Sequence, residues 1–285
     1  MRDKISKMIL KIKVKKNKMV KNQEALIMDD RFSDEQKNEI KLGIESGIDV
    51  YKYALSTYSA EQMKVIREGL QENLDVTFLL NPLLDSRQMY EIKYGMSIGI
   101  DVSEYAKSCF DIHQMKEIRL GICSNIAVSE YIDPRYDFRQ MQEIRIGLEK
   151  GLCVLYYTNP DFKWEQMQEI RLGLEQRLRV ETYAKTYFSW EQMREIRFGL
   201  LEGHDVRFYA KPDITLVQMR CARKQLNDRE QQKLKNSVKQ LTEELEELES
   251  MVSNLKYELK LKERELSNKR DELMAIENKF SGGDK

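Results

Sequence analysis

The sequence predicts an all-α protein, built as an α-solenoid of 26-residue helical hairpin repeats followed by a C-terminal coiled-coil helix. Three observations predict this fold class. Glutamine recurs every 26 residues from Gln36 to Gln218 without an insertion. The apolar residues after each glutamine form a stripe with the helical period. A heptad pattern then replaces the repeat from about residue 224 onward.

The residues around each glutamine predict where the first helix of a repeat begins. The residue three positions earlier is a good N-cap in seven of the eight units, which places the glutamine at N3 of a capping box. The apolar residue before the cap and the methionine after the glutamine can then pack together as a hydrophobic staple. The N-cap positions are Ser33, Ser59, Asp85, Asp111, Asp137, Lys163, Ser189 and Thr215.

Glycine or asparagine predicts where that helix ends. A left-handed residue at the C′ position closes a Schellman turn, so the first helix should run for about thirteen residues. The C′ residues are Gly47, Asn73, Gly99, Asn125, Gly151 and Gly203.

A short second segment completes each hairpin. An aspartate before a valine can cap it, but units four to six carry Ala127, Cys153 and Arg179 there, which puts their caps in question. Helices this short cannot bury their apolar faces alone, so neighbouring units must stack on a continuous core. A leucine-rich repeat has a similar period, but its L-x-x-L-x-L strand is absent. The capping aspartates are Asp49, Asp75, Asp101 and Asp205.

One row of basic residues is explained by neither capping nor packing and is the candidate partner-binding row. Its stacked charges could follow a phosphate backbone or an acidic partner. The interpretation we favour is structural, because this position borders the apolar stripe and a recurrent glutamate two residues earlier could pair with it across the unit boundary. The basic row is Lys41, Arg67, Lys93, Arg119, Arg145, Arg171, Arg197 and Arg223.

The two ends of the chain differ from the repeats. We expect a basic arm over residues 1–23, the solenoid of seven repeats and a terminal half-repeat over 24–223, a coiled coil over 224–280 and a disordered tail over 281–285. The arm could attach to nucleic acid or an anionic membrane surface, could be a disordered tail, or could be sequence upstream of a start at Met19. Its candidate contact residues are Lys11, Lys13, Lys15, Lys16 and Lys18.

The heptads predict an interface with another helix. In a parallel homodimer Glu244 would face Glu249 and Glu258 would face Glu263, so a partner helix with basic flanks fits better than a second copy. A homo-oligomer and folding back on the solenoid stay open. The predicted coiled-coil interface is Leu234, Val238, Leu241, Leu245, Leu248, Val252, Leu255 and Leu259.

Composition narrows the function. Basic and acidic residues balance at 48 each, which argues against a protein that binds nucleic acid over its whole surface. We expect no transmembrane segment, because no apolar run approaches the length of a span. The four cysteines and two histidines show no metal-ligand spacing, and we expect no catalytic residue, cofactor or metal. The absence of a signal peptide and of disulfide spacing predicts a cytoplasmic protein.

The unit Glu165-Gln166-Met167-Gln168-Glu169-Ile170-Arg171-Leu172-Gly173-Leu174-Glu175 resembles repeats in proteins of Firmicutes mobile elements and prophages. The resemblance covers residues 32–226 and implies an accessory protein of a phage or conjugative element, with no functional residues to carry over. The leading hypothesis is a non-enzymatic scaffold or adaptor for protein partners. The alternative is a nucleic-acid-associated accessory protein that uses the basic arm and the arginine row.

Overall fold

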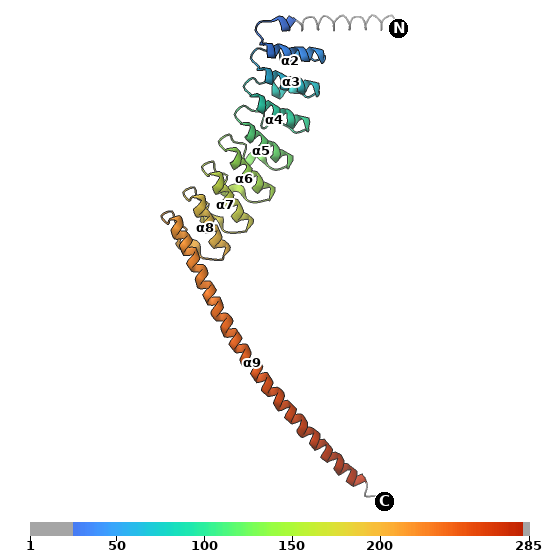
Figure 1. Cartoon of the computed structure of the whole chain (residues 1–285), viewed down its shortest axis with the longest axis vertical. Coiled ribbons are helices and arrows are strands. Elements are labelled where there is room, and N and C mark those ends of the chain that lie inside the picture. The colour runs from blue at the N-terminus through green and yellow to red at the C-terminus, as the bar shows by residue number, and fades with distance from the viewer. Residues whose placement is uncertain (1–24, 282–285) are drawn as a thin grey trace. The chain divides into compact units, whose positions relative to one another are not determined.

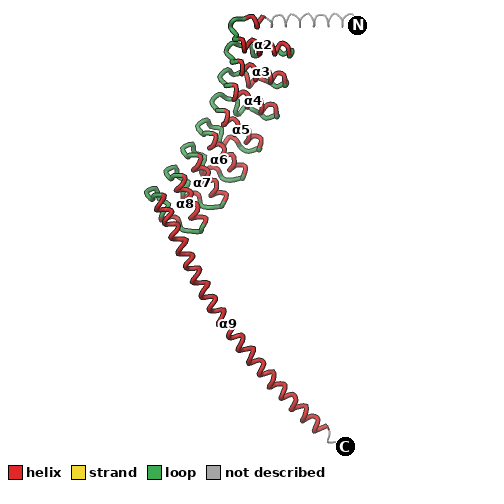
Figure 2. The backbone as a smooth tube through the Cα atoms, in the orientation of Figure 1, coloured by secondary structure: helices red, strands yellow, loops and turns green. Residues whose placement is uncertain are grey.

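A computed structural model describes residues 25–281, and this part of the chain is helical without a strand (Figure 2). The chain forms two compact units whose boundary lies between Leu216 and Val217. Unit 1 carries short helices that pack one after the next along the sequence, and unit 2 is a single long helix (Figure 1). The predicted fold class, an α-solenoid followed by a long helix, is confirmed.

Each repeat begins with an α-helix of 12 residues, close to the length predicted. Consecutive helices are the main packing neighbours of one another, as the stack in Figure 1 shows. The seven helices are α2 (Asp34–Glu45), α3 (Ala60–Gln71), α4 (Ser86–Ser97), α5 (Ile112–Cys123), α6 (Phe138–Glu149), α7 (Trp164–Glu175) and α8 (Trp190–Leu201).

The second half of each hairpin is shorter than a full helix. It is one turn of 3₁₀-helix, or, after α4, a turn, because the 14 residues between consecutive α-helices also hold the Schellman end and the entrance to the next helix. The turns are η2 (Val50–Lys52), η3 (Val76–Leu79), η4 (Val128–Glu130), η5 (Val154–Tyr156), η6 (Val180–Thr182) and η7 (Val206–Phe208), and η1 (Ala25–Met28) precedes the first repeat.

The predicted caps are present. In α2 to α6 and in α8 the N-cap side chain accepts the N3 backbone N–H, and the N3 glutamine accepts the N–H of the cap residue. Lys163 cannot accept, so α7 keeps only the bond from its backbone N–H to Gln166, at 2.6 Å. Asp49, Asp75 and Asp205 cap their 3₁₀ turns, whereas Ala127, Cys153 and Arg179 do not.

The Schellman ends are also present. The N–H of Ile48 donates to the carbonyl of Gly43, and Gly47 has a positive φ of 72° between them. A residue with positive φ occupies the same position in every later repeat. In the sixth repeat it is Arg177, at φ 58°, a residue type that pays a steric cost in this conformation.

The core contains a tyrosine row whose hydroxyl groups fit beside a glycine row. The Tyr157 hydroxyl donates to the carbonyl of Glu143, in α6 of the same repeat, at 3.3 Å. A Cβ on Gly147 would lie 1.9 Å from that hydroxyl oxygen, so no larger residue fits there. The same fit recurs at Gly43, Gly95, Gly121, Gly173 and Gly199.

The terminal half-repeat and the heptads form one continuous helix, α9 (Leu216–Ser281), of 66 residues. Its sequence holds neither glycine nor proline, so nothing ends the helix at the predicted junction of residues 223 and 224. The predicted basic arm lies outside the described residues, and so do residues 282–285 of the predicted tail.

Candidate functional site

The basic row forms ion pairs between neighbouring repeats. The Nε of Arg171 donates to a carboxylate oxygen of Glu143 at 2.6 Å, and both side chains are less than 10% exposed. Each such pair joins an arginine to the glutamate 28 residues earlier, which is the pairing the structural interpretation expected. The other pairs are Arg67 with Glu39, Arg119 with Glu91, Arg145 with Glu117 and Arg197 with Glu169.

The two lysines of the basic row, Lys41 and Lys93, do not form this pair. Val65 replaces the glutamate in the second repeat, so Lys93 reaches Glu68 at 3.2 Å and Glu72 at 2.8 Å instead. Within residues 25–281 no α-helix precedes α2, and Lys41 lies exposed, 3.9 Å from Glu45 of its own helix. Arg223 lies in α9. Six members of the candidate partner-binding row are therefore engaged within the solenoid.

Hydrogen bonds around the basic row favour the ionised forms of its side chains. Burial disfavours the charged form of Arg171, but its hydrogen bond to Glu143 raises its pKa above the ordinary value. Burial likewise opposes ionisation of Glu175, yet hydrogen bonds from Lys150 and Arg171 hold its pKa below the ordinary value. A pair buried in this way is costly to break from one side, because the remaining charge stays desolvated.

The glutamine row links repeats as well as capping helices. The Gln114 amide accepts from the backbone N–H of Asp111 and donates through Nε2 to the carbonyl of Tyr136, 22 residues later, at 2.6 Å. It also donates to the carbonyl of Pro134 at 3.3 Å. The capping-box pattern could not reveal this second role, although it explains why the residue is glutamine and not glutamate, which has no donor.

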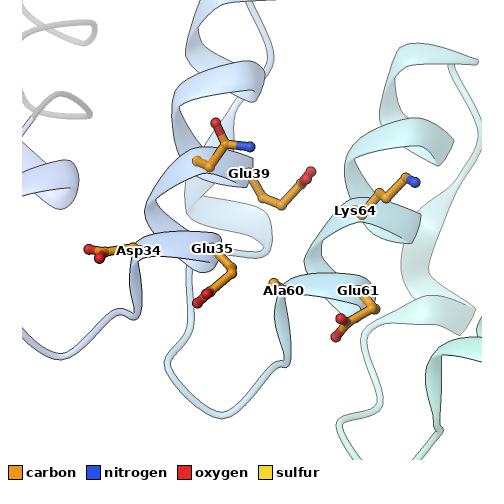
Figure 3. Close-up of a pocket in the computed structure, with 7 residues that line it drawn as sticks. Asp34, Glu35, Glu39, Ala60, Glu61 and Lys64 are labelled. Atoms are coloured by element: carbon orange, nitrogen blue, oxygen red, sulfur yellow. The ribbon is translucent and has the colours of Figure 1, made fainter.

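The solvent-facing sides of the α-helices carry the residues that differ between repeats. Between α2 and α3 this face is a shallow acidic groove, lined by Asp34, Glu35 and Glu39 of α2 and by Glu61 and Lys64 of α3 (Figure 3). The first position of the helix, which is Asp34 in α2, carries Phe138, Trp164 and Trp190 in α6, α7 and α8. Aromatic rings therefore begin the last three repeat helices, while Glu165 and Glu191 keep, at the next position of α7 and α8, the carboxylates that Glu35 and Glu61 provide in α2 and α3.

The predicted coiled-coil interface lies uncovered along α9. Its eight side chains, Leu234, Val238, Leu241, Leu245, Leu248, Val252, Leu255 and Leu259, are between 48% and 66% exposed. The 66 residues of α9 correspond to a rod about 100 Å long at 1.5 Å per residue. A single helix cannot bury such a seam by itself.

The described residues show no group of His, Cys, Asp and Glu arranged to hold a metal ion. Over the same residues, no helix combines the length and the apolar character needed to cross a bilayer. The candidate basic arm residues Lys11, Lys13, Lys15, Lys16 and Lys18 lie outside the described residues.

Comparison of the chain with family models, with curated proteins and with solved structures finds no match.

Proposed function

We propose that this chain is a non-enzymatic scaffold or adaptor, in which the solenoid presents a surface to partners and α9 recruits a helical partner or a second copy. The observation that carries the proposal is the uncovered seam of α9. Burying apolar surface contributes about 25 cal/mol per Å². Eight regularly spaced leucine and valine side chains therefore favour association with another helix strongly.

The charges beside the seam support a heterologous partner. Glu244, Glu249, Glu258 and Glu263 flank the seam, and a parallel second copy would place Glu244 opposite Glu249 and Glu258 opposite Glu263. A helix with basic flanks would pair with them instead. The proposed partner is therefore a protein whose helix is basic beside its apolar stripe.

The alternative proposal is a nucleic-acid-associated accessory protein of a phage or conjugative element. The ion pairs of the basic row lend it no support, because six of those residues already have carboxylate partners. Its remaining candidate is the basic arm. This alternative is kept as an outcome of the experiment below.

Affinity capture from the native host, with and without nuclease, tests the proposal. The seam variant is L245D/V252D, and its matched control, S250D/S253D, adds the same charge on the outer side of α9. We expect proteins that co-purify despite nuclease with wild type and control, and are lost with the seam variant. If the recovered proteins disappear with nuclease, the scaffold proposal is rejected in favour of the nucleic-acid alternative. If the seam variant still recovers them, the role proposed for the α9 seam is rejected and the alternative gains no support.

A further inference from the structure

Two arginines on the exposed face of the solenoid are held by aromatic rings, and no carboxylate pairs with either among the described residues. The Arg139 guanidinium lies 5.5 Å from the centre of the Phe138 ring and 5.4 Å from that of Trp164, one repeat later. The Arg194 guanidinium lies 4.7 Å from the centre of the Trp190 ring. Such stacking fixes the planar group and leaves its N–H donors for a ligand.

Two other groups of arginines in the solenoid are paired with carboxylates. Arg31, Arg135 and Arg207 are well exposed, yet each binds an aspartate two residues earlier at 2.6 or 2.7 Å. The arginines of the basic row bind buried glutamates. Arg139 and Arg194 thus differ from both groups, because their unpaired donors stand beside half-buried aromatic rings.

The neighbouring side chains add an apolar surface. Phe138, Trp164 and Trp190 each begin a helix, so the rings recur once per repeat along α6, α7 and α8. The exposed His113 ring lies 5.0 Å from the Phe138 ring at the near end. Tryptophan and arginine together are the residues that most often dominate the affinity of protein interfaces.

The charge pattern favours a polypeptide over a nucleic acid. Glu165 and Glu191 occupy the same helix position in α7 and α8 that Arg139 occupies in α6. A phosphate backbone carries a charge on every nucleotide and would be repelled by these carboxylates, of which Glu165 lies in α7, the helix between those that carry the two arginines. A polypeptide can place carboxylates only where the arginines stand and apolar side chains between them.

We propose that Phe138, Arg139, Trp164, Trp190 and Arg194, the aromatic–arginine face, dock a polypeptide segment that has carboxylates at both ends and an apolar centre. Neighbouring helices pack about 8–10 Å apart, so α6 and α8 are about 16–20 Å apart. That distance corresponds to about six residues of extended chain or about twelve of helix. The inference rests on the proposed scaffold function and names the chemistry of one partner of the solenoid.

Selection of peptides on the full-length protein tests this assignment. Phage displaying random peptides of about sixteen residues, long enough for either conformation, are selected on wild type and depleted on R139Q/R194Q. Enriched peptides are then titrated into the protein while tryptophan emission is recorded. The chain has two tryptophans, and both lie in this face, so the emission reports binding there directly. R87Q is the matched control, because Arg87 is exposed and occupies in α4 the position of Arg139 in α6.

We expect a consensus with acidic residues on both sides of apolar ones, and binding about tenfold weaker to R139Q/R194Q but unchanged for R87Q. No enrichment, a consensus without acidic residues, or equal binding to the double variant would overturn the assignment. If single-stranded DNA changes the tryptophan emission as much as the peptides do, the ligand of this face is a polyanion and not a polypeptide. If the emission changes with protein concentration alone, the ligand is a second copy of the chain. Because α9 is intact in every variant, these results are independent of the capture experiment on the seam.

Discussion

The fit between the glycine row and the tyrosine row makes a direct prediction about stability. In Gly147→Ala the new Cβ would lie 1.9 Å from the Tyr157 hydroxyl oxygen and 3.1 Å from a methyl of Val154. Tyr157 is fully buried and cannot move aside freely. The second repeat provides a natural control, because Leu79 replaces the tyrosine there. A Cβ on Gly69 would lie 3.1 Å from a methyl of Val76 and 3.4 Å from Leu79.

The magnitude follows from three contributions. Overpacking a buried site costs about 1–3 kcal/mol. Displacing the Tyr157 hydroxyl from the Glu143 carbonyl costs about 1 kcal/mol more. Alanine gains about 1 kcal/mol over glycine within a helix. We therefore expect Gly147→Ala to destabilise its repeat by about 2 kcal/mol, and Gly69→Ala to be neutral or stabilising by up to about 1 kcal/mol.

Amide hydrogen exchange, resolved by repeat with mass spectrometry, measures both changes locally. The expected loss corresponds to about thirtyfold faster exchange in α6, with no acceleration in α3 for the control. Tyr157→Leu should make Gly147→Ala tolerable, because it recreates the second repeat's environment. Equal effects of the two alanine substitutions, or no relief by Tyr157→Leu, would refute the role assigned to the hydroxyl.

Four further predictions concern the caps and the core. Gln114→Glu should lower the free energy of unfolding by about 3 kcal/mol, measured with urea, because a carboxylate oxygen would face the Tyr136 carbonyl. An unchanged unfolding midpoint would contradict the role of the Gln114 amide as a link between repeats. Arg177→Gly should stabilise the protein by about 1 kcal/mol and raise its melting temperature, since φ is 58° at this position. A lower melting temperature would argue against backbone strain at Arg177. Cys153→Asp should add about 0.5–1 kcal/mol by restoring the cap, as judged by the same melting experiment, because φ and ψ match those at Asp49. Burial raises the pKa of Tyr157 well above its ordinary 10.0, so the unfolded chain loses that proton first and stability falls as pH rises above about 10. Tyr157→Phe should make that fall shallower by up to about 1.4 kcal/mol per pH unit, and an identical slope would contradict the burial.

Local signals made much of the fold predictable from the sequence. Caps and Schellman ends depend on residues within a few positions of one another, so a serine before Gln36 or a glycine after Ile44 suffices to place a helix boundary. The absence of an aspartate at Cys153 likewise predicts the missing cap. The turn itself still forms there, since its backbone bonds do not need the side chain.

Contacts between residues far apart in the sequence were harder to predict from the sequence. The fit of Tyr157 against Gly147 and the amide bond of Gln114 across 22 residues require the stacking geometry, which the spacing alone does not provide. The ion pairs were expected because the glutamate and arginine rows share one period. The aromatic–arginine face could not be separated from core packing in the sequence, because its tryptophans continue an apolar helical pattern.

The most direct test of the scaffold is whether the α9 seam contacts a protein in the native host. A photo-crosslinking amino acid placed at Leu248 would lie on the seam, and the same residue placed at Ser250 would lie on the outer side of the helix. Irradiation of living cells, followed by denaturing gels with and without nuclease, then reads out the contact. We predict nuclease-resistant protein adducts from position 248 and none from position 250. No adduct at 248, equal adducts at both positions, or adducts that nuclease removes would contradict the proposed function.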